Sequence, residues 1–324
     1  MKIKHALTLA ILLAIPGREA LACAACGCLL SKDWVGQEDI THSGWAVGLS
    51  YDFINQNRMR LGNSNLSYPA ALNAVGGTGN EVETATATRI TTASISYNSG
   101  NWGWDAQLPY YDRYHTTMQT GDGGYNYSQS NELGDMRVMG KYNGIFADGS
   151  TGILFGVKLA TGTTNTSFAY GGLVDAALQV GTGSNDLILG AYHIGSIGKL
   201  GWFAQATYQF AISTTGGYRP GDTTNVNLGL RYAKFGQKVT PLFQINYIHR
   251  QSDSGPAASY YTGGPYIGTP ITGGDLAYLA PGASIRLGDG YAVYGYVQFP
   301  AYQNVVGVQL VAPRIYSLGI RKIF

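Results

Sequence analysis

The chain is organised as segments of about ten residues in which apolar and polar side chains alternate. Residues 204–210 are typical, because they read Ala-Gln-Ala-Thr-Tyr-Gln-Phe. Successive side chains of a β-strand point to opposite faces, so each segment has one oily face and one wet face. The connections alternate between a short turn and a long loop. Together these patterns predict an all-β fold, a transmembrane antiparallel up-and-down β-barrel with short periplasmic turns and long extracellular loops.

The composition agrees with a wall that faces lipid. Only 12% of the residues are charged, against roughly a quarter in soluble domains. The 46 glycines and 24 tyrosines suit a curved sheet with aromatic girdles at the two membrane interfaces. A net charge of only +2 argues against nucleic acid as a partner.

The N-terminus has the features of a secretory signal. Two lysines precede the apolar run from Ala6 to Ile15, which is too short to span a bilayer as a helix. Small residues up to Ala22 favour cleavage before Cys23. We therefore predict a signal peptide over 1–22, a cysteine-containing segment over 23–43 that could plug the barrel from the periplasm, and a barrel over 44–324.

Twelve segments read as strands, an even number as in bacterial barrels. They lie near 44–55, 86–97, 101–113, 132–146, 151–161, 185–195, 200–213, 224–235, 239–250, 277–287, 290–300 and 313–324. The short and long connections between them interleave without exception. This order places both termini on one side, which we predict to be the periplasm.

Alternation also assigns side chains to the lipid or to the lumen. In the first strand, Trp45, Val47 and Leu49 are assigned to lipid and Ser50 to the lumen. The charged residues assigned to the lumen, and hence to the solute path, are Arg137, Lys141, Lys158, Arg231, Arg250, Arg286, Arg321, Asp52, Asp105 and Asp135. Their positive excess would attract anions in a narrow pore. Alternatively, these charges pair with one another and fill the lumen.

Three cysteines, Cys23, Cys26 and Cys28, stand close together at the predicted mature N-terminus. The oxidising compartment favours one disulfide with one thiol left over. Three thiolates would also suit a soft metal ion such as Cu(I). Lipidation of Cys23 is a further alternative. No cofactor is predicted.

Seven phrases distributed along the chain resemble the outer-membrane barrel family named for the meta-pathway of phenol degradation. They are Tyr51-Asp52-Phe53, Leu108-Pro109-Tyr110-Tyr111-Asp112-Arg113, Leu133-Gly134-Asp135-Met136-Arg137, Phe155-Gly156-Val157-Lys158-Leu159-Ala160-Thr161-Gly162, Gly181-Thr182-Gly183-Ser184-Asn185-Asp186, Gly217-Tyr218-Arg219-Pro220-Gly221-Asp222 and Phe299-Pro300-Ala301-Tyr302-Gln303-Asn304. The family usually has proline where Ala160 stands. The resemblance implies an outer-membrane barrel with a transport role and no catalytic residues.

The last strand ends in Phe324, preceded by apolar residues at alternate positions, although Lys322 interrupts the alternation. This ending resembles the signal by which the barrel assembly machinery recognises its clients. The expected partners are therefore outer-membrane lipid, that machinery and a small solute.

The predicted function is a channel in the outer membrane of a Gram-negative type cell for passive passage of small hydrophilic, anionic or aromatic solutes. One alternative is a barrel hydrolase, although the chain has no Gly-x-Ser-x-Gly or His-Glu-x-x-His motif. The other is a barrel that partners a metal or electron-transfer system through the N-terminal cysteines. We predict that the protein is not an enzyme.

Overall fold

The computed structural model describes residues 43–75, 81–119, 124–232, 238–258 and 270–324. Its elements are β1 (Gly44–Gln56), β2 (Arg58–Gly62), β3 (Ser64–Asn65), α2 (Tyr68–Val75), β4 (Glu81–Ser99), β5 (Trp102–Gln119), β6 (Tyr125–Leu133), β7 (Met136–Tyr142), β8 (Thr151–Leu159), the 3₁₀ helix η2 (Ala176–Leu178), β9 (Ser184–Ile197), β10 (Leu200–Thr214), β11 (Thr223–Tyr232), β12 (Val239–Arg250), β13 (Gly274–Gly288), β14 (Tyr291–Val311) and β15 (Ile315–Ile323). Among these residues, no helix has the length and apolar character needed to cross a membrane.

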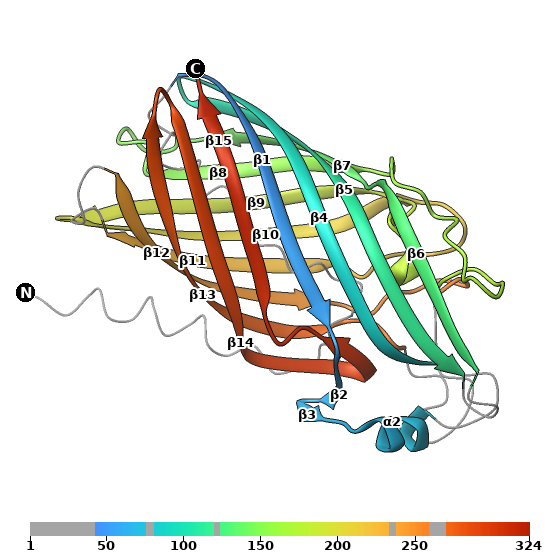
Figure 1. Ribbon diagram of the computed structural model, residues 1–324. Coiled ribbons are helices and arrows are strands. Elements are labelled where there is room, and N and C mark those ends of the chain that lie inside the picture. Colours follow the sequence, from blue (N-terminus) through green and yellow to red (C-terminus); the bar gives the residue numbers. More distant parts are fainter. Residues whose placement is uncertain (1–42, 76–80, 120–123, 233–237, 259–269) are drawn as a thin grey trace, which may run out of the picture.

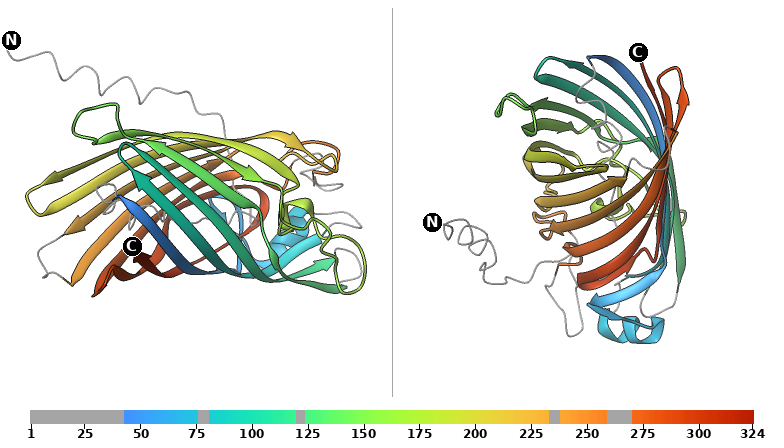
Figure 2. Two further views of the ribbon diagram at one scale, coloured as in Figure 1. Left: turned by 90° about the horizontal axis from the view of Figure 1, so that it is seen from above. Right: turned by 90° about the vertical axis from the view of Figure 1, so that its left-hand side faces the viewer.

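Within the described ranges, twelve strands pair antiparallel with their neighbours and close into a barrel (Figures 1 and 2). The ring runs β1, β4, β5, β7, β8, β9, β10, β11, β12, β13, β14 and β15, and β15 pairs with β1 to close it. Each of the twelve predicted segments overlaps one strand of this ring. The predicted fold class and strand number are therefore confirmed.

The two ends of the barrel differ in how the strands are joined. One end carries β-turns and the chain terminus after β15, and we call it the short-turn end. At its turn between β13 and β14, residues Gly288, Asp289 and Gly290 have φ angles of 100°, 49° and 77°, which explains the preference for glycine and aspartate there. The other end carries the longer connections, and we call it the long-loop end.

At the long-loop end, several strands continue past the barrel wall. β4 has 19 residues and β5 has 18, whereas a tilted strand needs only about 9–11 to cross a bilayer. β6 extends the wall by pairing with the outer part of β5. α2 packs Ala71 and Val75 against Val82 of the β4 extension.

Two strand boundaries differ from the sequence expectation. The predicted strand 132–146 is two strands, β6 and β7, separated by Gly134 and Asp135. The amide of Gly134 donates to the Pro109 carbonyl over 2.8 Å, and a Cβ there would lie 2.4 Å from the Tyr111 ring, so the bend requires glycine. The loop predicted after 300 is mostly strand, because β14 continues to Val311 and pairs there with β2.

The barrel wall separates an apolar outer face from an inner face of mixed character. On β1, Trp45 and Leu49 point outward and are 52% and 50% exposed, whereas Ser50 and Asp52 point inward and are 7% and 0% exposed. The outward ion pair between Arg89 and Asp112, 3.0 Å apart, marks where the apolar band ends toward the long-loop end. The assignment of β1 side chains by alternation therefore matches the structure.

Candidate channel lumen

The half of the barrel near the short-turn end encloses a cavity of about 1030 Å³, counting space that opens to solvent. We call this cavity the inner chamber. Four alternate residues of β4, namely Thr92, Ser94, Ser96 and Asn98, form one of its walls. Because alternate residues share a face, the Thr-x-Ser-x-Ser-x-Asn pattern gives the chamber a wall of hydroxyl and amide groups. Tyr192 and Gln205 add further polar groups to it.

Charged residues of the inner chamber lie on several strands. Lys141 and Arg321 line it together with Asp105, which accepts a hydrogen bond of 2.6 Å from Gln107. The stem of Lys141 lies over Gly103, where an ideal Cβ would be 2.2 Å from the lysine chain. Glycine at this position therefore leaves space for a long basic side chain to lie along the wall.

Two further basic side chains lie toward the short-turn end. Arg231 lies over Gly201 on the inner face of the wall. Arg286 pairs with the inward-facing Ala292 close to the last turn and is exposed. Of the ten charged residues assigned to the lumen, this half thus holds four basic ones against the single acid Asp105, a difference of three positive charges.

The long-loop half contains a buried ion network around Lys158. Its ammonium group lies 3.1 Å from Asp135 and 3.2 Å from Asp186 and donates a further hydrogen bond of 3.0 Å to Ser184 Oγ. It also contacts the Thr182 hydroxyl. Asp135 accepts hydrogen bonds from the backbone amides of Gly162 and Thr182 as well. Lys158 and Asp135 therefore tie the loop between β8 and β9 to the inner wall.

The other predicted lumen charges of this half also have partners. Arg250 donates to Asp253 over 2.5 Å, and Arg137 donates to the side-chain Oε1 of Gln209 over 3.2 Å. The fully buried Asp52 accepts a hydrogen bond of 2.6 Å from Ser317. Around Lys158 and Arg250, the acids Asp186 and Asp253 add negative charge to that of the predicted acids. The long-loop half therefore lacks the excess of positive charge found in the short-turn half.

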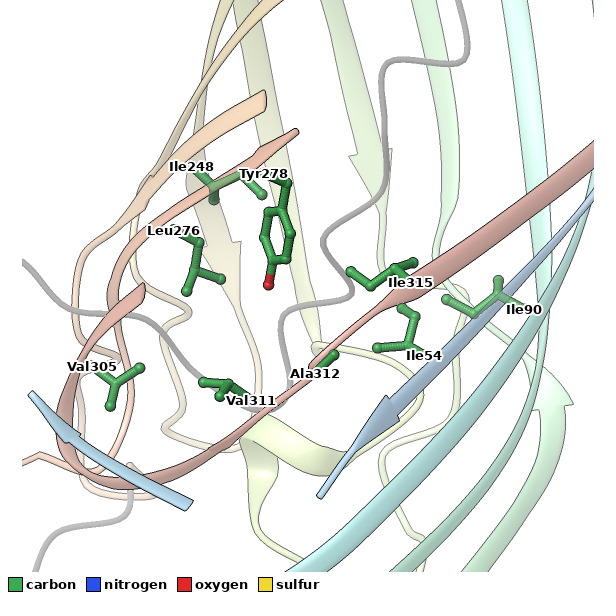
Figure 3. Packing of buried hydrophobic residues seen from close by; sticks show 9 residues of the cluster. All are labelled: Ile54, Ile90, Ile248, Leu276, Tyr278, Val305, Val311, Ala312 and Ile315. Atoms are coloured by element: carbon green, nitrogen blue, oxygen red, sulfur yellow. The ribbon is translucent and has the colours of Figure 1, made fainter. Parts of the chain in front are cut away.

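An apolar cluster occupies the lumen between the inner chamber and the long-loop end (Figure 3). We call it the apolar belt. Its residues come from β1, β4, β12, β13, β14, β15 and the connection before β15: Ile54, Ile90, Ile248, Leu276, Tyr278, Val305, Val311, Ala312 and Ile315. Tyr111 of β5 packs against it, so seven of the twelve barrel strands contribute. Apart from the hydroxyl groups of Tyr278 and Tyr111, its side chains cannot hydrogen-bond water.

The loop from 160 to 183 packs onto the inner face of the β5 extension. Phe168 and Leu178 belong to one buried cluster, and the Phe168 ring lies 6.0 Å from the ring of His115. Arg113 donates hydrogen bonds to the Leu178 and Gln179 carbonyls over 2.6 and 3.3 Å. The guanidinium of Arg113 and the packing of Phe168 thus hold the middle of this inner loop, while Lys158 and Asp135 hold its ends.

Two titratable groups beneath the inner loop have displaced pKa values, and both lie beyond the Arg89–Asp112 pair. Burial, together with the charges of Asp175 and Glu81, raises the pKa of Glu83 to about 8. Burial and the neighbouring Arg113 lower the pKa of His115 to about 4. Both groups therefore favour the neutral form near neutral pH.

Sequence reasoning missed the apolar belt, the inner loop and the acids Asp186 and Asp253. The belt did leave a signal, because the alternation fails where two apolar residues are adjacent, as at Phe53-Ile54 and Tyr247-Ile248. Asp253 lies beyond the end of β12, where alternation does not apply, whereas Asp186 lies near the start of β9 and follows the inward alternation. Their pairing with Lys158 and Arg250 depends on how the loops fold back.

The described residues offer little for the catalytic and metal alternatives. Within them, no group of three or more His, Cys, Asp or Glu side chains could hold a metal ion. His249 contacts Asp275 over 3.0 Å, while His193 contacts the Thr151 hydroxyl over 2.7 Å. Cys23, Cys26 and Cys28, and the predicted signal peptide, lie outside the described residues.

Comparison with known proteins supports the architecture. No family model matches the chain, and no curated protein matches it; the resemblance to the phenol meta-pathway family is not confirmed. An outer-membrane channel from Pseudomonas putida F1 superposes with a TM-score of 0.56 at 10% identity, over 87% of this chain and 96% of that chain.

Two further solved structures give lower scores. The CymD monoaromatic hydrocarbon channel superposes with a TM-score of 0.48 at 11% identity, over 95% of both chains. The β domain of the Bordetella autotransporter BrkA scores 0.47 at 14% identity, over 87% of this chain and all of that chain. Because the Pseudomonas putida channel shares only 10% sequence identity with this chain, the similarity shows the fold alone, that of outer-membrane barrels.

Proposed function

We propose that the protein is a passive channel of the outer membrane for small hydrophilic solutes. The observation that carries this proposal is the inner chamber, a space with hydroxyl, amide and charged groups on its wall, enclosed by a closed barrel with an apolar outer face. Passage through such a lumen requires no cofactor. The solved outer-membrane channel with the same fold supports the proposal by analogy.

The polar groups of the chamber wall support hydrophilic solutes, and apolar side chains such as Met139 and Leu154 share the lining. Hydroxyl and amide groups on β4 and β10 replace hydrogen bonds that a solute loses when it leaves water. The excess of basic side chains at the short-turn half favours anions among such solutes. An aromatic ring would find its apolar contacts at the apolar belt, farther along the lumen.

The orientation in the membrane is part of the proposal. Periplasmic turns are short in barrels of this type, so the short-turn end and the inner chamber would face the periplasm. The long-loop end, with its strand extensions and inner loop, would face the outside. The apolar belt would then lie near the outer mouth of the channel.

The proposal is tested by conductance of the purified, refolded protein in planar bilayers. We expect stepwise conductance and swelling of liposomes with small sugars and carboxylates. Ser94→Trp places a large ring inside the chamber and should remove most of the conductance. Ile95→Trp places the same ring on the lipid face one residue away and should leave conductance unchanged. Folded protein without conductance would contradict the proposal.

A further inference from the structure

A single line of strand pairing passes through most of the basic side chains of the lumen. From the short-turn end, Arg286 pairs with Ala292, which pairs with Arg321, which pairs with Gly48. The line then continues through Ser94, Gln107, Arg137, Lys158 and Asp186, each paired with the next on the neighbouring strand. We call these nine residues the register row. Four of the seven basic residues assigned to the lumen belong to it.

The register row climbs the barrel because the strands are tilted. It crosses eight strand-to-strand steps, from β13 to β9 through the closure of the ring. Neighbouring strands lie about 4.8 Å apart and tilt by about 35–45°, so eight steps raise the row by about 22–27 Å along the barrel axis. That rise matches an apolar band about 25 Å tall. One row therefore leads from the short-turn end to the long-loop end.

The four members of the row that lie between its arginines are small or can donate hydrogen bonds. Ala292 and Gly48 are small, and a Cβ at Gly48 would lie 2.6 Å from the Ser94 hydroxyl. Ser94 and Gln107 line the inner chamber and lie between Arg321 and Arg137. That gap spans four steps, or about 19 Å, which exceeds the screening length of about 8 Å. Solvent ions would screen an anion midway along this gap from both guanidinium charges. The hydroxyl and amide groups therefore offer it hydrogen bonds between the two arginines.

Lys141, Asp105 and Asp135 are charged residues outside the row that lie close to it. Lys141 and Asp105 share the inner chamber with Arg321, and Asp105 is engaged by Gln107 of the row. At the upper end, Asp135 and Asp186 hold Lys158. Lys158, held by both carboxylates, forms the fixed end of the row.

We propose that the register row is a stepwise binding path for small anions, carboxylates included, and this proposal rests on the channel function proposed above. An anion passes between the guanidinium groups of Arg286, Arg321 and Arg137, and Ser94 and Gln107 hydrogen-bond to it between them. Guanidinium groups bind carboxylates through two parallel hydrogen bonds. The tilt that closes the barrel thus converts a pairing line into a transport path.

The test is the reversal potential of single channels under a potassium chloride gradient, repeated with potassium acetate. Arg286→Gln and Arg321→Gln should each lower the ratio of anion to cation permeability by about threefold. Arg321→Lys should retain most of it. The matched control is Lys322→Gln, which removes the same charge from the next residue, whose ammonium group lies outside over the Tyr291 ring at 4.2 Å. This control should leave the ratio unchanged.

Arg231→Gln tests whether selectivity depends on the register row or only on the total charge of the lumen. Arg231 faces inward, but its strand pairing follows another line. Its effect should be less than half that of Arg321→Gln. An effect equal to that of Arg321→Gln would contradict the proposed binding path, because the total charge of the lumen would then set selectivity. A wild-type channel that conducts without anion preference would overturn the row but not the channel. Folded protein that does not conduct would overturn the proposed function as well.

Discussion

Lys158 shows how a residue can be placed correctly on the inner face while its role remains hidden in the sequence. Alternation along β8 puts it inside, and the same reasoning puts Asp135 inside. Their contact, and that of both with the loop before Asp186, joins three segments that are distant in sequence. No local pattern encodes such a contact. The charged pairs of the long-loop half therefore could not be predicted from the sequence.

Lys158→Met is expected to destabilise the barrel by about 3–5 kcal/mol, because it leaves Asp135 and Asp186 buried without their shared cation. The matched control is Lys199→Met in an exposed turn, which should change the free energy of unfolding by less than about 0.5 kcal/mol. Urea titration of the refolded protein in lipid vesicles measures both values. Equal values would mean that the network does not stabilise the fold.

Among the elements, strands followed from the sequence and loops did not. The twelve strands follow from alternation, which each segment carries by itself. The inner loop has no such periodicity, and it is positioned by Arg113 and by Phe168 packing on His115. The same distinction explains why the split between β6 and β7 was missed, since it depends on how Gly134 meets Tyr111.

Docking of the inner loop is expected to be strongest in mildly acidic solution. The raised pKa of Glu83, about 8 against 4.5, means that the docked loop binds the extra proton, so docking weakens as pH rises from 4.5 through 8. The lowered pKa of His115, about 4 against 6.5, has the opposite sign, so docking also weakens as pH falls from 6.5 through 4. Hydrogen exchange of the amides of residues 166–179 measures docking. Glu83→Gln should remove most of the alkaline loss and keep the acidic one, while burial and the charge of Asp175, which raise the pKa of Glu81, leave a smaller alkaline loss; a profile unchanged by this variant would refute the assignment.

For the molecule as a whole, closure of the ring could be predicted but the division of its lumen could not. Twelve strands with two unlike faces have to close, because open edges are not tolerated in lipid. The sequence therefore predicts a barrel, and the structure confirms it. Whether the lumen is polar along its whole length depends on which inward-facing residues contact one another across the barrel. Ile54, Ile90 and Ile248 meet there although they are 36 and more residues apart.

The apolar belt is expected to limit conductance, because a hydrophobic constriction excludes water and raises the barrier to ions. Ile90→Ser should hydrate the belt and raise single-channel conductance about two- to fivefold, at a cost of about 2–4 kcal/mol in unfolding free energy from lost packing. Leu154→Ser is the matched control, since Leu154 lines the inner chamber away from the belt; it should leave conductance close to that of the wild type. If both variants conduct alike, the resistance of the channel lies elsewhere, and the inner loop, rather than the belt, becomes the constriction to test. Because no residue belongs to both the belt and the register row, the two can be tested by separate variants. On these two proposals, the belt would set how much current flows, and the row would set which ions carry it.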